Sequence, residues 1–242
     1  MARHVLERTD STMSEAARLA PQLAGPAWIL ALEQTAARGR RGRAWRHPKG
    51  NFSATLVMKP WHGPERAALY SFVAALALEA ALAQLAGPHA RLSIKWPNDV
   101  LLNGGKVAGI LLESLGTGGQ ISHLAIGIGV NLAEAPGAAE VEPGAMAPVS
   151  LLGETGVAIT PQAFLPFLAR AFASYQQQFE TYGFAPIRTA WLARAARLGE
   201  TVTARMSSET VTGRFETIDE AGNLILATAH GPRPIAAGDI FF

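Results

Sequence analysis

The sequence contains no cysteine, and only 17% of its 242 residues are charged. The absence of cysteine excludes a disulfide scaffold, a thiolate zinc site and a catalytic thiol, including an acyltransferase that works through a cysteinyl thioester. The first ten residues, MARHVLERTD, lack the apolar run of a secretory signal. The most apolar stretch, between Arg66 and Glu79, is shorter than the about 20 residues that span a bilayer. We therefore expect a soluble cytoplasmic protein.

Charge is also nearly balanced, because 21 Lys and Arg residues face 19 Asp and Glu residues. A dedicated nucleic-acid binder usually gathers an excess of positive charge on one face. The dense basic segment is ARGRRGRAW, residues 37–45, called the arginine loop below. Glycine lets a backbone approach a ligand, and arginine offers paired donors that match phosphate oxygens. We interpret the arginine loop as a ligand site, and the alternative is a merely solvated loop.

The apolar pattern predicts an α+β fold in two parts. Residues 1–196 should form a domain with a mixed, largely antiparallel sheet flanked by helices, and residues 197–242 a small β domain. The expected strands are residues 4–8, 27–35, 51–59, 91–96, a hairpin over 99–115 that turns at 103–105, and 122–132. The expected helices are one that begins in residues 11–20, then 64–87, 161–183 and 185–199. Residues 133–148 show no periodicity and predict a loop.

Two further segments carry polar residues at strand ends or on apolar strands. KWPND, residues 95–99, ends a strand abruptly and places Asn98 and Asp99 at a turn, although such turns are common without any function. Lys106 lies on an otherwise apolar strand, which is costly without an anionic partner. The only nearby acid in the sequence, Glu113, falls on the opposite strand face by alternation. We therefore predict that Lys106 faces an anionic ligand.

Small and polar residues mark two more places. GIGVN, residues 127–131, holds two bare glycines in an apolar strand, so we expect a group to pack flat against it, either a ligand or a helix. Ser11 and Thr12 precede a helix, where they can cap it or form a polar corner for a ligand, and Thr12 has capping-box spacing to Glu15. Trp45 can stack on a flat ring or anchor the core.

RGRRGRAW, KWPND, the K-x-x-G that begins at Lys106, and GIGVN occur in the order and at the separations found in the biotin protein ligases. The sequence closely resembles that family from about Ser11 to Asn131, and more weakly through the C-terminal β domain. The resemblance implies a fold related to class II aminoacyl-tRNA synthetases, with an SH3-like C-terminal barrel. It also implies that ATP activates biotin to biotinyl-5′-AMP, and that the biotinyl group passes to a lysine of the biotin carboxyl carrier domain of acetyl-CoA carboxylase or a related carboxylase. Mg²⁺ is expected on the ATP phosphates, and no side chain is assigned as a metal ligand.

The resemblance also implies roles for individual residues. The biotin site would comprise Ser11, Thr12, Gln34, Arg38, Gly39, Arg40, Lys106 and Gly109. The ATP site would comprise Arg40, Arg43, Trp45, Lys95, Asn98, Lys106 and Asn131. Arg40 would hold the reactive intermediate, and Lys106 would face the biotin carboxylate and the α-phosphate. Asp99 would orient or deprotonate the incoming lysine.

Two positions depart from the family pattern. Ala37 replaces the first glycine of Gly-Arg-Gly-Arg-Arg-Gly, so either this residue has an ordinary φ or the loop begins differently. Met13 stands where the family often has Asn, so one contact to the ureido ring of biotin is lost or made elsewhere.

Two other functions compete with this interpretation. A lipoate–protein ligase would have the same reaction type and a related fold. An RNA-binding module could use the arginine loop and the small β domain, but it leaves Lys106 and GIGVN unexplained. Because only Met1 to Arg3 precede the first strand, we expect a ligase without a DNA-binding domain. We expect neither nucleic acid nor a membrane as a partner, and the sequence leaves a homodimer open.

Overall fold

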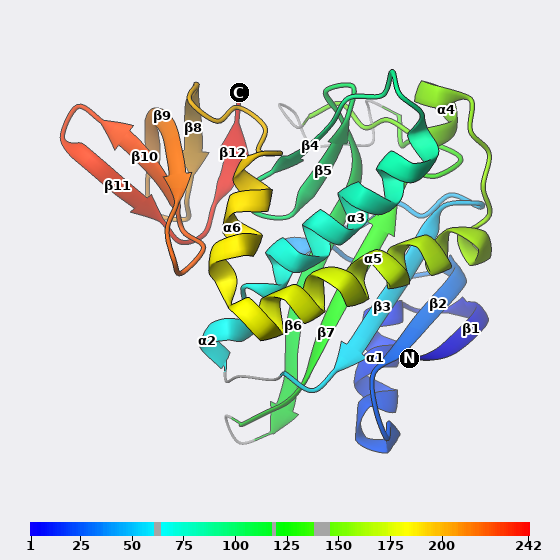
Figure 1. The fold of residues 1–242 in the computed structure, drawn as a ribbon. Helices are drawn as coiled ribbons and strands as arrows, with labels where there is room; N and C mark the ends of the chain where they lie inside the picture. The colour runs from blue at the N-terminus through cyan, green and yellow to red at the C-terminus, as the bar shows by residue number, and fades with distance from the viewer. Residues whose placement is uncertain (61–63, 118–119, 138–145) are drawn as a thin grey trace.

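The computed structural model describes residues 1–60, 64–117, 120–137 and 146–242. Its larger sheet has seven strands in the order β1-β2-β3-β7-β6-β5-β4 (Figure 1). β1 and β2 are parallel, and each further neighbouring pair of this order is antiparallel, which confirms the predicted mixed, largely antiparallel sheet. The strands are β1 Ala2–Thr9, β2 Ala27–Gln34, β3 Phe52–Met58, β4 Leu92–Lys95, β5 Asp99–Leu102, β6 Gly105–Thr117 and β7 Gln120–Val130.

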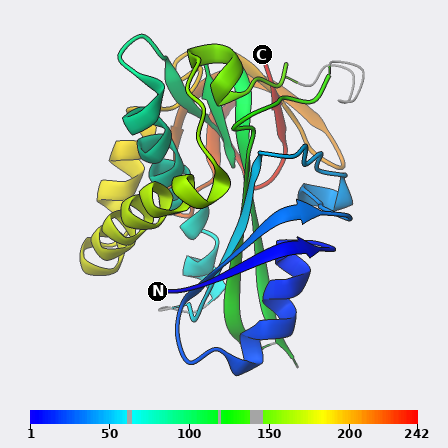
Figure 2. The same ribbon diagram turned by 90° about the vertical axis from the view of Figure 1, so that its right-hand side faces the viewer.

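Helices cover both faces of this sheet. Successive side chains of a strand point to opposite faces, so an apolar strand such as β2 packs against helices on both sides. On β2, Trp28 and Leu30 pack with helices α3 and α5, whereas Ile29 packs with Met13 of helix α1 on the other face. Figures 1 and 2 show α3, α5 and α6 on one side of the sheet and α1 on the other. The helices are α1 Thr12–Leu19, α2 Pro64–Ala67, α3 Tyr70–Ala86, α4 Leu151–Thr155, α5 Pro161–Tyr182 and α6 Phe184–Leu192, with short 3₁₀ helices η1 Ala20–Gln22 and η2 Arg40–Gly42.

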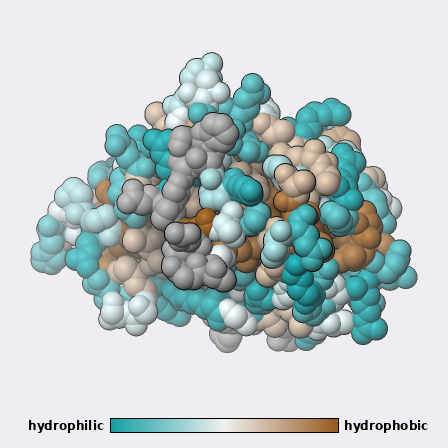
Figure 3. Space-filling view, turned by 90° about the horizontal axis from the view of Figure 1, so that it is seen from below, coloured by the Kyte–Doolittle hydropathy of each residue, from teal (hydrophilic) through white to brown (hydrophobic). Residues whose placement is uncertain are grey.

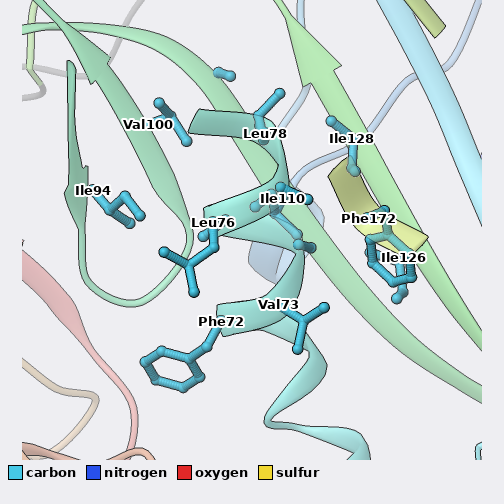
Figure 4. Close-up of a cluster of buried hydrophobic side chains, with 14 of the residues drawn as sticks. Phe72, Val73, Leu76, Leu78, Ile94, Val100, Ile110, Ile126, Ile128 and Phe172 are labelled. Atoms are coloured by element: carbon cyan, nitrogen blue, oxygen red, sulfur yellow. The ribbon is translucent and has the colours of Figure 1, made fainter. Parts of the chain in front are cut away.

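The main core lies between α3 and the sheet. α3 is apolar almost all round, as suits a helix packed between the sheet, α5 and α6, and it exposes Ala83 and Gln84 near its end. Figure 4 shows side chains of α3 converging with those of β4 to β7 and α5. The labelled members are Phe72, Val73, Leu76, Leu78, Ile94, Val100, Ile110, Ile126, Ile128 and Phe172.

The C-terminal strands form a separate five-stranded antiparallel sheet in the order β11-β10-β9-β8-β12, as expected for a small SH3-like domain. This sheet lies beside α6 and β4 (Figure 1). The buried Trp96 Nε1 donates to the Gly222 carbonyl oxygen at 3.0 Å, which ties the two sheets together. The strands are β8 Thr201–Arg205, β9 Thr210–Ile218, β10 Leu224–Thr228, β11 Gly231–Ile235 and β12 Asp239–Phe241.

Three local predictions need correction. The expected helix over 64–87 is divided into α2 and α3. The expected helix over 185–199 ends at Leu192, because the following residues pair with β4: Ile94 N donates to Arg194 O, and Ala196 N donates to Ile94 O, both at 2.8 Å. Ser11, not Thr12, caps α1 by accepting from Ser14 N at 3.0 Å. The predicted loop over 133–148 lies partly outside the described residues, which omit 138–145.

No helix in the described ranges combines the length and apolarity that crossing a membrane requires. Seen from below, the surface shows mostly hydrophilic residues with hydrophobic ones scattered between them (Figure 3).

Candidate active site

A cavity of about 580 Å³ opens where the arginine loop, the start of α1, the strands β5 to β7 and β12 meet. It is lined by residues from all four motif segments that the sequence marked. The fourteen residues assigned above all lie on its wall, namely Ser11, Thr12, Gln34, Arg38, Gly39, Arg40, Arg43, Trp45, Lys95, Asn98, Asp99, Lys106, Gly109 and Asn131. The four segments therefore line one cavity.

The arginine loop is a closed turn held by its own backbone. Gly39 N donates to Arg43 O at 2.7 Å, and Trp45 N donates to Ala37 O at 3.0 Å. Of the non-glycine residues that the structure describes, only Arg41, Asn103 and Arg197 have positive φ, and Arg41 reaches 56° inside the loop. Ala37 thus has an ordinary φ, and the loop tolerates this departure from the family glycine.

The first two arginines of the loop have different partners. Arg38 Nη2 lies 3.0 Å from Glu113 Oε2, and its Nη1 donates to Ser14 Oγ at 3.0 Å. Arg40 Nη1 donates to Asn98 Oδ1 at 3.3 Å and to Gly238 O at 3.4 Å. Partial burial lowers the pKa of Arg40, and the nearby Asp239 and Asp99 carboxylates oppose that change, so a half-buried cation that stays charged faces the cavity.

Lys106 has an anionic partner that the sequence did not indicate. Its Nζ lies 2.8 Å from Asp99 Oδ1, so the inference that no acid other than Glu113 is near was wrong. The inference considered only the strand that carries Lys106. Asp99 begins the antiparallel neighbour β5, and a bulge between Val100 and Leu101 shifts the register between β5 and β6. The Lys106 ammonium also lies 5.6 Å from the centre of the Trp45 ring.

Lys95 adds a second ammonium group to the same wall. Burial lowers its pKa, and Lys106 acts in the same direction, whereas the Asp99 and Asp239 carboxylates oppose the change. The wall therefore holds closely spaced cations whose repulsion an anionic ligand would relieve.

The two bare glycines of β7 form the floor of the cavity, and side chains of the arginine loop and of α1 pack closely against them. A Cβ on Gly129 would lie 2.7 Å from Trp45 Nε1, and a Cβ on Gly127 would lie 2.7 Å from Met13 Sδ. Trp45 is half-buried against this floor rather than an anchor of the main core. Met13, the second departure from the family pattern, supplies a buried apolar side chain to the wall.

The start of α1 is both a helix cap and a polar corner of the cavity. Ser11 Oγ caps the helix and donates to Ser14 Oγ at 2.8 Å. Thr12 N donates to Gln34 Oε1 at 2.7 Å, and Thr12 Oγ1 accepts from Thr55 Oγ1 at 2.8 Å. Each side chain is therefore fixed in position before a ligand enters.

Asn131 is buried at the opposite end of the floor. Its Nδ2 donates to Val149 O at 3.0 Å, whereas its Oδ1 is buried and has no hydrogen-bond partner among the described residues. A buried acceptor without a partner is costly, so this oxygen is suited to a donor on a ligand. Ser53 Oγ, also on the cavity wall, is in the same state.

The sequence did not indicate that the C-terminal sheet contributes to the site. Gly238 and Asp239 line the cavity and contact the arginine loop across sequence separations of 196 and 198 residues. No local pattern around GDIFF marks these two residues, because their partners are fixed only when the two sheets pack together.

Comparisons with known proteins agree with this geometry. A model of the Biotin/lipoate A/B protein ligase family matches residues 5–131, and a model of the Biotin protein ligase C terminal domain matches residues 198–242. Biotin–[acetyl-CoA-carboxylase] ligase of Paracoccus denitrificans is 61% identical over 238 residues, which cover 98% of this chain and 99% of that protein. Bifunctional ligase/repressor BirA of Bacillus subtilis is 32% identical over 213 residues, which cover 88% of this chain and 65% of that protein.

A solved structure shows the same fold. The biotin protein ligase from Aquifex aeolicus in complex with biotin and ATP superposes with a TM-score of 0.84 and covers 99% of this chain and 97% of that one. Its sequence identity is 24%, so this likeness concerns the fold. Because a family model spans more than half of the chain and a curated relative matches nearly all of it, the chain belongs to the Biotin/lipoate A/B protein ligase family, among its biotin protein ligases.

Proposed function

We propose that the cavity is the place where this biotin ligase joins biotin to AMP and then transfers the biotinyl group to a lysine of a biotin carboxyl carrier domain. The observation that carries the proposal is the gathering of Arg40, Lys95 and Lys106 around one cavity that also has an apolar floor. Biotin and ATP are both anions, so a site that brings them together must offset their repulsion. The apolar floor suits the rings and the alkyl chain of the substrates.

The reaction has two steps, and both need positioning more than covalent help from the protein. In the first step an oxygen of the biotin carboxylate attacks the α-phosphorus of ATP, and pyrophosphate leaves. In the second step the amine of the acceptor lysine attacks the acyl carbon, and AMP leaves. Holding the reactants together in a cationic site can account for much of such an acceleration.

Lys106 is placed to stabilise charge at the reacting atoms. Its ammonium projects from β6 between Asp99 and the Trp45 ring, so its direction is set before a substrate arrives. We assign it to the biotin carboxylate and the α-phosphate. Asp99 holds Lys106 in the first step and orients the incoming amine in the second.

The polar corner at the start of α1 is the proposed site for the ureido ring. Ser11 and Thr12, with Gln34 from β2, lie there beside the backbone of Arg38 and Gly39. Because Gln34 Oε1 already accepts from Thr12 N, its amide nitrogen is the group left to face a ligand. Gly109 and Met13 would border the rest of biotin.

The other end of the cavity is the proposed ATP site. Trp45 offers a ring face or edge to the adenosine, and the bare Oδ1 of Asn131 accepts from a ligand donor. Arg40, Arg43, Lys95 and Asn98 would contact the phosphates. Among the described residues, the carboxylates on the cavity wall are Asp99 and Asp239, and each is paired with a cation, which suits Mg²⁺ that arrives on the ATP phosphates rather than a dedicated protein cage.

The acceptor, the cellular location and the domain boundaries complete the proposed function. The acceptor is the carrier domain of acetyl-CoA carboxylase or a related carboxylase, as the name of the Paracoccus relative suggests. The enzyme acts in the cytoplasm. Residues 1–196 form the catalytic domain and 197–242 the C-terminal domain, a division supported by the start of β8 at Thr201.

The test supplies purified protein with labelled biotin, ATP and a folded carrier domain, and measures label on the carrier. A parallel arm replaces biotin with lipoate, and pyrophosphate exchange is followed with each acid. We expect exchange and transfer with biotin alone. Transfer of lipoate but not biotin would establish the competing lipoate–protein ligase, and no exchange with either acid would reject the proposal.

A further inference from the structure

One carboxylate of the C-terminal sheet holds two arginines of the arginine loop. Asp239 Oδ2 lies 2.9 Å from Arg41 Nη1 and 2.8 Å from Arg43 Nη2. The neighbouring carbonyl oxygen of Gly238 accepts from Arg40. Three of the four arginines in the loop thus end on two consecutive residues at the start of β12.

One half-buried carboxylate, that of Asp239, pairs with two arginines, and this keeps Asp239 ionised. The Asp239 side chain is 21% exposed, against 44% for each of its arginine partners. Burial raises the pKa of Asp239, but the hydrogen bond and ion pair with Arg43 and the ion pair with Arg41 outweigh it, so the pKa lies below the ordinary value. Asp239 therefore remains an anion at neutral pH.

Asp239 also contacts the loop at Arg41, the residue whose backbone conformation is unfavourable. Arg41 has φ 56° and ψ 26°, a left-handed conformation that a residue with a side chain rarely adopts. Such a conformation persists only when surrounding contacts fix it. The ion pair with Asp239 is a contact at this residue that comes from outside the loop.

We propose that Asp239 is a positioning residue that keeps the arginine loop closed over the cavity, so that the C-terminal domain controls how fast the activated intermediate escapes. The retention part of this inference rests on the proposed function. Asp239 acts through Arg41 and Arg43 and needs no contact with the substrate. Loss of its charge should open the loop while the catalytic wall around Lys106 stays intact.

The first test is hydrogen–deuterium exchange of loop amides in the full chain, followed at the hydrogen-bonded amides of Gly39, Arg43 and Trp45. Asp239→Asn removes the charge at nearly constant shape, and exchange should rise by about two- to thirtyfold, the range for two partly exposed ion pairs. Asp239→Glu should restore most of the protection. The matched control is Glu216→Gln, which breaks the 2.8 Å pair with Arg214 in the same sheet but away from the cavity.

A double-mutant cycle distinguishes loss of the Asp239–Arg41 contact from a general loss of stability. Arg41→Gln should raise exchange in the wild-type background and add little in the Asp239→Asn background, because the shared contact is already gone. Additive effects would overturn the proposal, as would unchanged exchange in Asp239→Asn or an equal rise in Glu216→Gln.

The second test measures retention of the intermediate. Enzyme loaded with labelled biotin and ATP is mixed with albumin, and the label on albumin reports escaped adenylate. Asp239→Asn should increase this label roughly in proportion to its loop exchange. If exchange rises but escape does not, Asp239 does not control retention. If the wild-type protein makes no adenylate, the proposed function fails, and the exchange experiment alone still decides whether Asp239 closes the loop.

Discussion

Gly129→Ala tests whether the floor of the cavity positions Trp45. A Cβ at this position would lie 2.7 Å from both Cε2 and Nε1 of Trp45 and 2.9 Å from Cζ2. Ordinary contacts of this kind begin at 3.4 Å, so the ring must move by about 0.7 Å. Gly129 is paired on both sides, with Ser53 of β3 and Gly109 of β6, and its φ is not in the left-handed region. The backbone therefore accepts alanine, and the ring takes up the strain.

The expected cost is that of adding one carbon to a packed contact, about 1 to 3 kcal/mol. If Trp45 contacts ATP, most of this cost should appear as weaker ATP binding, by about 5- to 150-fold. Thermal stability should change little, because Trp45 is half-buried and can move toward the cavity. The affinity for biotin should fall less than the affinity for ATP.

The assay is biotin-dependent pyrophosphate exchange at varied ATP concentration. Gly25→Ala is the matched control, because no atom lies within 4 Å of its added carbon, and Gly109→Ala should give an intermediate effect, since its carbon would lie 3.3 Å from Trp45. The reasoning is refuted if Gly129→Ala leaves the KM for ATP unchanged, or if Gly25→Ala raises it equally.

Three further predictions address other parts of the account. Lys106→Ala should slow pyrophosphate exchange by at least about tenfold, because a charge-assisted contact worth roughly 1.5 to 3 kcal/mol is lost; an unchanged rate would make Lys106 a structural residue. Arg40→Gly should still form adenylate but release it onto albumin lysines, and labelling no higher than wild type would contradict retention by Arg40. Burial lowers the pKa of His47 below 6.5 despite its hydrogen bond to Asn51 O, so the unfolded chain binds more protons and the free energy of unfolding should fall as pH drops below 6.5. His47→Gln should weaken that dependence in urea titrations at pH 5 and 7, and an unaltered dependence would exclude His47 as its source.

The residues predicted for the site line one cavity in the structure, whereas several predicted helix boundaries were wrong. The arginine loop, KWPND, Lys106 and GIGVN lie around one cavity because each motif lies at or next to a strand end in the same region of the sheet. The sequence predicted helix ends less well. The segment after Leu192 leaves its helix to pair with Ile94, a tertiary contact that outweighs a helical pattern.

Two contacts of the site could not be predicted from local patterns. The Asp99–Lys106 pair depends on a bulge in the β5–β6 register, and alternation along one strand carries no information about the neighbouring strand. The Asp239 contacts depend on how two separately formed sheets pack together, which the buried Trp96–Gly222 hydrogen bond helps to fix.

The most direct test of the central claim is a crystal structure of the protein after a soak with biotin and ATP. We expect density for biotinyl-5′-AMP in the 580 Å³ cavity, with the acyl-phosphate junction beside Lys106 and Arg40. The ureido ring should lie at the start of α1, and the adenosine beside Trp45 and Asn131. Density for the adenylate elsewhere, or an acyl-phosphate junction that contacts neither Lys106 nor Arg40, would contradict the account.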